Sequence, residues 1–485
     1  MSSPADGAGL LDAVVVGAGP NGLAAAITLA RAGRSVRVLE GADEIGGGAR
    51  SSTEVLPGCV VDTCSAIYPF GRTSPFFASA GLDRHGLRWI EPPYALAHPL
   101  DGGRAILVSR DVEATARQLG RDRDGYRRLF SPLQARFGAL IPDILAPFHV
   151  PVWPPPRTAR LAWFGLHALQ PAELLARRFR GEEARALLAG AAAHSVLPLN
   201  EAASGGAALV MLGSAHHDGW PFPEGGAGAI SRALGSELRS LGVVIETGRP
   251  VRSAGDLGPA RLALFDTSPR LVASMAGDRL PRHYRRALRR FRYGPAVFKL
   301  DIAIEGAIPW AARGVDLAGT VHLGGTFEEI AASEADATVG RHNPRPFVLL
   351  AQQSLFDATR SPGGQHVVWA YCHVPSGTTV DMTEAILGQV ERFAPGFRER
   401  ILAVARTTPA DLETRNPNNV GGDMTGGRMS LGQLFTRPGG AATVLDPYAT
   451  PDPRTFIASS STPPGGGVHG MCGWHAAQSA LRRLG

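Results

Sequence analysis

The hydrophobic pattern at the start of the chain predicts a strand, a helix and a second strand. Residues 13–16 form a short apolar run, which is typical of a buried parallel strand. An alanine-rich segment continues to about Ala32, and Gly33 ends the predicted helix. Residues 35–39 alternate between polar and apolar side chains, as a second strand does. The chain therefore opens with a predicted strand–helix–strand unit of α/β type.

The turn between the first strand and the helix carries three glycines at the spacing of a dinucleotide site. Gly17 permits a tight turn, Gly19 lets the backbone approach a diphosphate, and Gly22 lets helix and strand pack closely. We group Pro20 with them as a cofactor-binding residue, at a helix N-terminus that faces the phosphates. Glu40 follows the second strand, where an acid binds ribose hydroxyls. We predict a dinucleotide site; the alternative is an ordinary glycine-rich turn.

A second glycine run, residues 46–48, follows the second strand and lets another loop approach the cofactor phosphates. It resembles the second FAD fingerprint of the large flavoprotein class that includes amine oxidases and phytoene desaturases. This resemblance favours FAD over NAD as the cofactor, and it implies that Gly47, Gly48 and Arg50 bind it. A flexible surface loop is the alternative interpretation.

The end of the chain adds a third glycine-rich turn. Residues 455–460 predict a short strand and residues 474–484 a helix. The turn between them resembles the one in this class whose helix N-terminus faces the flavin ring and stabilises negative charge on it. It implies three further cofactor-binding residues, Gly466, Gly467 and Val468. Val251 ends a predicted strand over residues 243–251 and resembles the position whose backbone contacts adenine.

The rest of the pattern predicts a discontinuous second domain. Residues 105–215 are mainly helical in pattern, and residues 280–415 mix strands with helices, the last helix being expected at 396–405. We predict an α/β fold in which a Rossmann-type FAD-binding domain, glutathione-reductase-like and of the amine-oxidase subclass, carries an α+β substrate domain. The FAD-binding domain is assigned to residues 1–95, 219–279 and 425–485, and the substrate domain to residues 96–218 and 280–424.

Composition narrows the class of protein. The net charge is +6, with arginine supplying almost all of the positive charge, and no long block of like charge suggests a nucleic-acid partner. No apolar run reaches the roughly 18–20 residues of a membrane span. Residues 1–11 lack the features of a signal peptide, so we expect a cytoplasmic protein. Residues 157–170 are compatible with peripheral membrane contact, although packing in a helical domain is the simpler interpretation.

The cysteines and the remaining motifs suggest no competing chemistry. Cys59 and Cys64 have the spacing of a redox disulfide in glutathione-reductase-like enzymes, but they lie too late in the chain. Those enzymes also carry a second, nicotinamide-binding unit, which the sequence lacks. Free thiols are therefore expected, and no metal-ligand spacing is present.

Over most of its length the chain resembles the phytoene-desaturase-related FAD-dependent oxidoreductases, and within them the bacterial relatives of pyridine nucleotide-disulphide oxidoreductase domain protein 2. The resemblance is carried by residues 14–40, 46–54, 57–62, 220–230, 293–304, 393–398, 411–413, 421–423, 433–435 and 464–477. Two segments near the expected flavin depart from the family pattern. Trp474 and His475 stand where relatives often have Arg-Asn, and residues 64–70 replace a more usual Gly-Ser-His-like segment.

Two residues are candidates for catalysis. Lys299 lies in an alternating strand pattern and resembles the amine-oxidase lysine that reaches flavin N5 through a water. A solvated or salt-bridged strand lysine is the alternative. His475 and His469 lie on the turn and helix expected to face the flavin, and we expect one of them to bond flavin or substrate.

Other polar and aromatic residues have weaker assignments. His216 and His217 are expected to be a surface-loop pair rather than an acid or base. The following aromatic residues could line an apolar pocket, although each one alone is more typical of plain core: Tyr68, Phe70, Trp220, Phe222, Trp369 and Tyr371.

The resemblance implies an FAD-dependent oxidoreductase that takes hydride from an apolar small molecule and forms a C=C or C=N bond. Oxygen or a quinone is the expected electron acceptor. A flavin-dependent amine-type oxidase, favoured by Lys299, and a redox-neutral polyene isomerase are the alternatives, and a non-enzymatic flavin-binding scaffold is the simplest rival.

Overall fold

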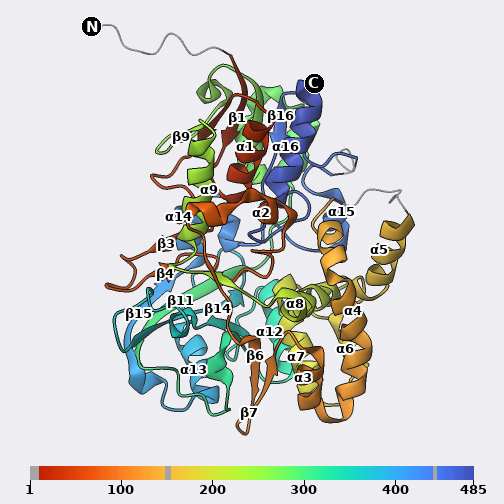
Figure 1. Cartoon of the computed structure of the whole chain (residues 1–485), viewed down its shortest axis with the longest axis vertical. Coiled ribbons are helices and arrows are strands. Elements are labelled where there is room, and N and C mark those ends of the chain that lie inside the picture. The colour runs from red at the N-terminus through yellow and green to blue at the C-terminus, as the bar shows by residue number, and fades with distance from the viewer. Residues whose placement is uncertain (1–9, 148–154, 441–444) are drawn as a thin grey trace.

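The computed structural model describes residues 10–147, 155–440 and 445–485, so the expectation for the first residues of the chain lies largely outside it. The upper part of the molecule in Figure 1 is built on a five-stranded parallel sheet of order β16-β10-β1-β2-β9. Its strands are β1 (Leu11–Val16), β2 (Val36–Leu39), β9 (Val244–Glu246), β10 (Ala260–Phe265) and β16 (Thr455–Ile457). The predicted strand–helix–strand unit is confirmed, because α1 (Pro20–Arg31) joins β1 to β2.

Alternating side chains give this parallel sheet a buried layer on each face. Val15 and Val38 belong to the core shared with α1, α9 (Gly228–Ser240) and α16 (Met471–Leu484). Val14 and Val16 point the other way, into the core shared with α10 (Pro269–Met275) and α11 (Arg282–Arg289). Such a sheet, covered on both faces, explains the continuous apolar runs of its strands.

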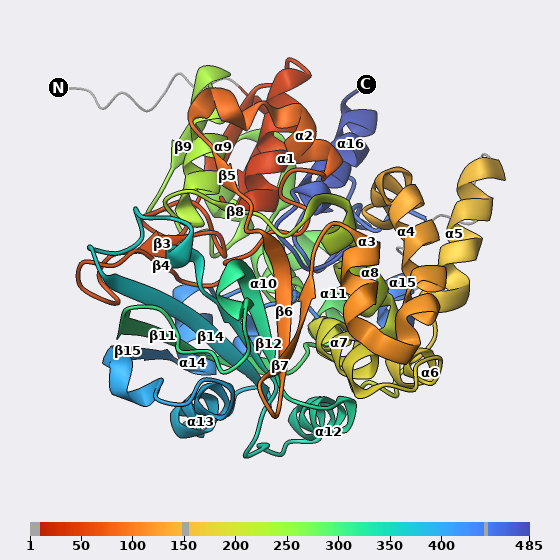
Figure 2. The same cartoon turned by 60° about the horizontal axis from the view of Figure 1, so that its bottom comes forward.

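A larger, mostly antiparallel sheet forms the lower part of the molecule, in the order β15-β11-β14-β13-β12-β6-β7 (Figures 1 and 2). Its strands are β6 (Tyr94–Leu100), β7 (Arg104–Val108), β11 (Ala296–Glu305), β12 (Ala318–Leu323), β13 (Val348–Ala351), β14 (Gln365–Val374) and β15 (Ile401–Thr407). The predicted α/β fold with a separate mixed sheet is therefore confirmed. The exact domain boundaries stay a prediction.

The prediction of a helix at residues 396–405 is wrong. A single 3-10 turn (Arg398–Arg400) leads into β15, which pairs antiparallel with β11 along the sheet edge. The backbone bonds offered by that edge decide the structure here, because a short apolar pattern fits either period.

Helices cover both faces of the large sheet. Ile386 and Val390 of α13 (Thr383–Phe393) belong to the same buried core as Phe298 and Leu300 of β11. A helical layer beside the sheet consists of α3 (Val112–Ala116), α4 (Arg123–Ile144), α5 (Pro155–Ala168), α6 (Ala172–Ala176), α7 (Glu182–Ala192) and α8 (Ser204–Asp218) (Figure 2). The remaining elements are α2 (Pro75–Ala80), α12 (Phe327–Thr338), α14 (Pro409–Arg415), α15 (Leu431–Thr436), β3 (Ser51–Ser52), β4 (Val61–Asp62), β5 (Trp89–Ile90) and β8 (Phe222–Pro223).

A buried cluster of charges joins the two sheets. Asp62 of β4 accepts a hydrogen bond from Arg360 at 2.7 Å and another from the backbone N–H of Ala227 at the start of α9. Asp357 pairs with the same guanidinium at 3.2 Å. All three charged side chains are at most 3% exposed. The cluster fixes the position of β4 between the two sheets, and with it the loop that carries Cys64.

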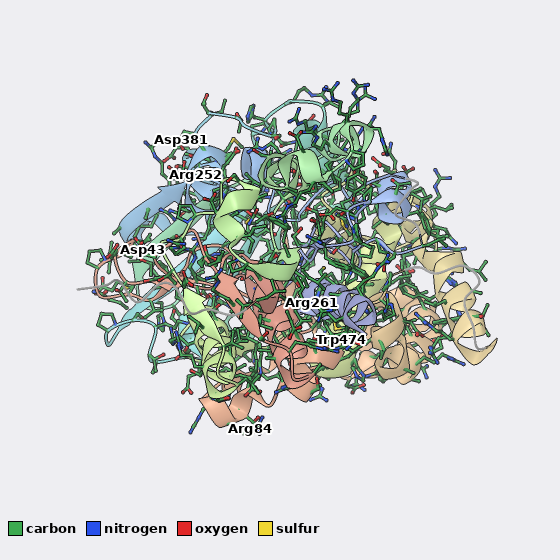
Figure 3. All side chains as sticks on the ribbon, turned by 90° about the horizontal axis from the view of Figure 1, so that it is seen from above. Asp43, Arg84, Arg252, Arg261, Asp381 and Trp474 are labelled. Atoms are coloured by element: carbon green, nitrogen blue, oxygen red, sulfur yellow. The ribbon has the colours of Figure 1, made fainter. Side chains whose placement is uncertain are left out.

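Charged side chains of both signs are spread over the surface. Figure 3 shows Asp43, Arg84, Arg252 and Asp381 around the outline of the molecule. Among the described residues, no helix has the length and apolarity needed to cross a membrane.

Candidate functional site

The first glycine turn has the close packing that its sequence predicts. Gly17 has a φ of +98°, and a Cβ on Gly22 would lie 2.0 Å from the carbonyl oxygen of Gly17. Pro20 is the first residue of α1, where its missing N–H has no partner to lose. Only glycine fits at positions 17 and 22, so the N-terminus of α1 is held tightly against the end of β1.

Glu40 lies directly after β2 and beside this turn. Its carboxylate accepts hydrogen bonds from the N–H of Ala18 at 2.6 Å and the N–H of Ala42 at 2.9 Å. A carboxylate has about four acceptor positions, so two remain for the hydroxyls of a ribose. The contacts orient Glu40 at the carboxyl edge of the parallel sheet, where dinucleotides bind.

Asp266 is a residue at this site that the sequence analysis did not assign. It follows β10, and its Oδ2 accepts a hydrogen bond from the N–H of Gly22 at 2.8 Å. A Cβ on Gly19 would lie only 2.7 Å from the same oxygen. Burial, together with the negative charge of Glu40, raises the pKa of this carboxyl group to about 7. The available signal was its position, one residue beyond a strand that neighbours β1.

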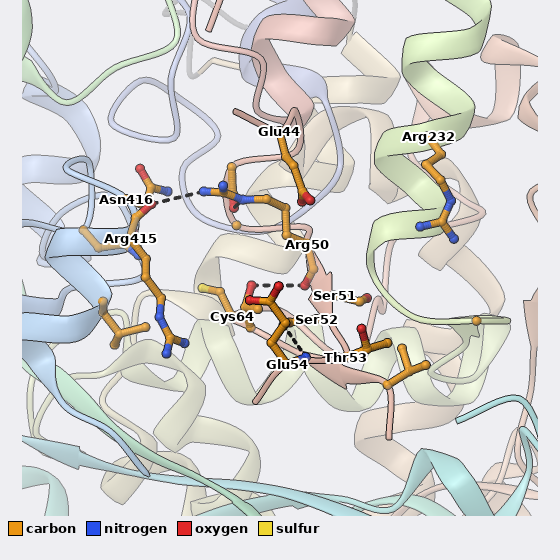
Figure 4. A pocket seen from close by; sticks show the side chains of 17 residues that line it. Glu44, Arg50, Ser51, Ser52, Thr53, Glu54, Cys64, Arg232, Arg415 and Asn416 are labelled. Atoms are coloured by element: carbon orange, nitrogen blue, oxygen red, sulfur yellow. Dashed lines mark hydrogen bonds between the residues drawn. The ribbon is translucent and has the colours of Figure 1, made fainter. Parts of the chain in front are cut away.

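The second glycine run touches the first. A Cβ on Gly47 would lie 3.1 Å from the Cα of Gly19, and Gly48 lies near Cys64. Arg50 is held by backbone carbonyls, since its Nε donates to Gly47 at 2.9 Å and its Nη2 donates to Arg415 at 3.1 Å (Figure 4). The two loops predicted to approach cofactor phosphates are therefore neighbours.

These loops border a pocket of about 510 Å³. Gly47, Gly48, Arg50 and Cys64 are among its lining residues, and Figure 4 shows Arg415 and Arg232 on opposite sides of it. Three arginines and the carboxylates of Glu44 and Glu54 are among the lining residues. Burial raises the pKa of the Cys64 thiol to about 11, so this cysteine is a neutral thiol at physiological pH. All four cysteines are free.

The N-terminus of α16 lies against the N-terminus of α1. A Cβ on Gly473 would lie 1.7 Å from the carbonyl oxygen of Asn21, so only glycine permits this approach. The preceding turn carries Gly466 and Gly467, the second with a φ of +123°. Val468 in the same turn is partly buried. Two positive helix ends therefore converge beside both glycine loops, which favours an anionic ligand there.

Two other predicted residues have mainly structural contacts. The side chain of Val251 packs with Leu39 and Leu257 in the core below the parallel sheet. His475 donates to the carbonyl oxygen of Leu145 at 3.0 Å and stacks on Tyr448. His475 therefore faces the end of α4, and its surroundings differ from those of Lys299. His469 is the more enclosed histidine: its Nε2 is buried without a partner among the described residues.

Lys299 is fully buried on β11 and forms an ion pair with Asp301 on the same strand. Its ammonium group also lies 5.9 Å from the centre of the Trp369 ring. Burial raises the pKa of Asp301, and the charge of Lys299 opposes that effect. Of the two interpretations of Lys299, the salt-bridged strand lysine describes the geometry, and the charge of Lys299 partly opposes the rise that burial causes in the pKa of Cys64.

The prediction that His216 lies in a surface loop is wrong. This residue lies in α8, is 1% exposed, and bonds to the Tyr126 hydroxyl at 2.7 Å and to the Ser109 carbonyl at 2.8 Å. The C-terminal end of α8 packs on α4, and this packing buries His216 although the local sequence is polar. Trp220 is buried as well, whereas Tyr371 keeps accessible surface.

Comparisons with known proteins agree with this architecture. A family model described as an NAD(P)-binding Rossmann-like domain matches residues 15–78. The chain is 27% identical to pyridine nucleotide-disulfide oxidoreductase domain-containing protein 2 of Rattus norvegicus, over 98% of this chain and 94% of that protein. It is also 27% identical to phytoene dehydrogenase of Streptomyces griseus, over 84% of this chain and 79% of that protein.

The fold is similar to that of a solved putrescine oxidase bound to putrescine. The two share 18% identity with a TM-score of 0.62, over 98% of this chain and 99% of that one. The likenesses together confirm the predicted resemblance to the phytoene-desaturase-related oxidoreductases, the Rossmann-type fold that it implied, and the oxidoreductase class of enzyme.

Proposed function

We propose that this protein is an FAD-dependent oxidoreductase that takes hydride from an apolar small molecule. The observation that carries the proposal is the convergence of two glycine loops and two helix N-termini on one place, with Gly47 against Gly19 and Gly473 against Asn21. Positive helix ends and close backbone approach suit a diphosphate, and Glu40 suits the adjoining ribose. The described residues therefore fit FAD.

The chain's own residues have distinct roles in this proposal. Gly17, Gly19 and the N-terminus of α1 bind the diphosphate, and Glu40 orients the ribose. Gly466, Gly467 and the N-terminus of α16 favour negative charge at the flavin end. When bound, FAD supplies the two-electron acceptor, and the reaction leaves a C=C or C=N bond in the substrate. Oxygen or a quinone is the proposed final acceptor.

An amine-type oxidation is the second candidate. The fold likeness to putrescine oxidase and the position of Lys299 support it. The pairing of Asp301 with Lys299 argues against it, because that carboxylate is not available to an ammonium substrate. A redox-neutral isomerase remains the candidate in which the flavin is not reduced by substrate.

The cofactor itself is the direct test. Purified protein should be yellow, and acid precipitation should release one FAD per chain into the supernatant. Glu40→Ala should lower the FAD content, because it removes the ribose contact, whereas the surface variant Glu399→Ala should leave it unchanged. Anaerobic mixing with NADH or NADPH should reduce the flavin slowly or not at all. Rapid, saturable reduction by either, or NAD in place of FAD in the supernatant, would contradict the proposal.

A further inference from the structure

One face of the large sheet carries a row of aromatic and imidazole rings. We call this the inner face, defined by the side chains of Lys299, Tyr371 and His322. It is turned toward β4, since Trp369 on β14 donates to the carbonyl oxygen of Asp62 at 3.1 Å. The strands β14, β13, β12 and β6 follow one another in the sheet (Figure 2), so the row crosses several strands. Successive rings lie about 5 to 6 Å apart between centres: Trp369, Tyr371, His373, Phe347, His322 and His194.

Charged groups on the inner face are paired with one another. The carboxylate of Asp301 forms an ion pair with the ammonium group of Lys299. The carboxylate of Glu334 on α12 accepts a hydrogen bond from His373 Nδ1 at 2.8 Å. The side chains of both pairs are at most 1% exposed. A free ammonium group could bond to either carboxylate only by displacing its present partner, which is costly in a buried pair. The face therefore favours an uncharged molecule.

Three histidines at the far end of the row are held as neutral rings. His98 donates from Nε2 to the Gly325 carbonyl at 2.9 Å, so its Nδ1 is a lone pair. His194 and His322 share a hydrogen bond of 3.0 Å between their Nε2 atoms. Burial lowers the pKa of His194 to about 3, with His373 adding to the effect, and burial also lowers the pKa of His322. The described residues contain no group of three or more histidine, cysteine, aspartate or glutamate side chains that could hold a metal ion.

The unpartnered Nδ1 of His322 decides which of the two rings donates in the hydrogen bond that His322 shares with His194. Nδ1 of His322 is buried without a partner among the described residues, beside Gly190. A buried N–H without a partner is unfavourable, and such orphaned donors are rarer than unfilled acceptors. His322 therefore carries its proton on Nε2 and donates to His194. The proton of His194 must then be on Nδ1.

His194 lies deep in the protein and still keeps accessible surface. It belongs to a 3-10 turn (Ala193–Ser195) after α7, and its ring is 5.6 Å from that of Trp220. No hydrogen bond to its Nδ1 occurs within the described part of the chain. Tyr371 combines the same two properties, since burial raises its pKa while part of its surface stays accessible. The N–H of His194 is thus an unused donor in a mostly aromatic interior.

We propose that the Nδ1–H of His194 donates a hydrogen bond to an uncharged oxygen, a carbonyl or hydroxyl, of the substrate. This inference rests on the proposed function and names its substrate class: an apolar molecule that bears an oxygen away from the reacting carbon. β12, which holds His322, is three strand spacings from β11, which holds Lys299. At about 4.8 Å per spacing, the oxygen would lie roughly 14 Å from the strand of Lys299.

Binding of three probes of matched chain length to the FAD-loaded protein tests this inference. The probes are decan-2-one, decane and decylamine, followed by flavin fluorescence and equilibrium dialysis at pH 7.5. We expect decan-2-one to bind at least tenfold more tightly than decane, and more tightly than decylamine. His194→Phe should reduce the preference over decane to less than about threefold, with decane binding unchanged. His194→Gln, which keeps a donor, should retain part of it.

Controls separate this inference from the proposed function. His217→Phe exchanges a histidine that packs on Phe137 and should keep the full preference. FAD content and circular dichroism of each variant report folding and loading. Absence of FAD contradicts the proposed function. In loaded protein, equal binding of decan-2-one and decane, a preference that survives in His194→Phe, tightest binding of decylamine, or no binding of any probe would overturn the role of His194.

Discussion

Asp266 should make the stability of the protein depend on pH, in a direction opposite to that of a salt-bridged aspartate. Its carboxylate is 8% exposed and faces the carboxylate of Glu40, so burial and repulsion both penalise the charged form. The pKa rises from 3.8 to about 7. At about 1.4 kcal/mol for each tenfold change, the charged form costs the fold on the order of 4 kcal/mol.

The sign follows from where the proton is bound. Between pH 3.8 and about 7 the folded protein holds a proton on Asp266 that the unfolded chain has released. The contribution of Asp266 to stability is therefore unfavourable above pH 7 and disappears as the pH falls toward 4. Asp266→Asn removes this dependence and keeps an oxygen that can accept from the N–H of Gly22.

The assay is the melting temperature of the FAD-free protein between pH 5 and pH 8.5, compared pairwise so that other titrating groups cancel. Asp266→Asn should melt at a higher temperature than the unmodified protein at pH 8.5, and the difference should shrink steadily toward pH 5. Asp278→Asn is the control, because the side chain of Asp278 is 98% exposed. A difference for Asp266→Asn that stays constant across this range would refute the reasoning.

Two further substitutions test buried ion pairs. Lys299→Met alone should destabilise the protein by about 3–5 kcal/mol, since it leaves Asp301 charged and uncompensated, and Lys299→Met with Asp301→Leu should recover most of that loss in melting temperature. If Lys299 also acts at the flavin, the double variant should reoxidise its flavin at least tenfold more slowly, whereas unchanged rates would make Lys299 purely structural. Arg360→Met should lower stability by a similar 3–5 kcal/mol and increase proteolysis near β4, because it leaves Asp62 and Asp357 unpaired; Arg345→Met, on a side chain 67% exposed, should change little.

The sequence predicts the first half of the candidate site because its signals are local. Gly17, Gly22 and Glu40 lie within one strand–helix–strand unit, where the spacing of glycines alone specifies close backbone packing. The role of Asp266 could not be predicted in this way, although its side chain lies at the same turn. Its role depends on β10 being the neighbour of β1, and the two strands are far apart in the chain.

The far end of the inner face could not be predicted from the sequence, for the same physical reason. His194, His322 and His98 come from a turn and two strands whose adjacency exists only in the folded sheet. β15 is a related case: residues 401–407 read locally as part of a helix, and pairing with β11 makes them a strand. Contacts between distant segments override weak local preference wherever an edge strand offers backbone partners.

Partners also decide what each polar residue can do, and this bears on the choice between the proposed reactions. Lys299 viewed alone resembles the lysine of amine oxidases, which favours an amine-type oxidation. With Asp301 beside it, Lys299 is part of an ion pair on its own strand, and the carboxylate of Glu334 likewise has a partner in the ring of His373. We expect a face whose charges are paired internally to bind a substrate through its rings and through donors that have no partner among the described residues, such as the N–H of His194. The same fold that binds putrescine in a solved oxidase can therefore favour an uncharged, oxygen-bearing substrate here.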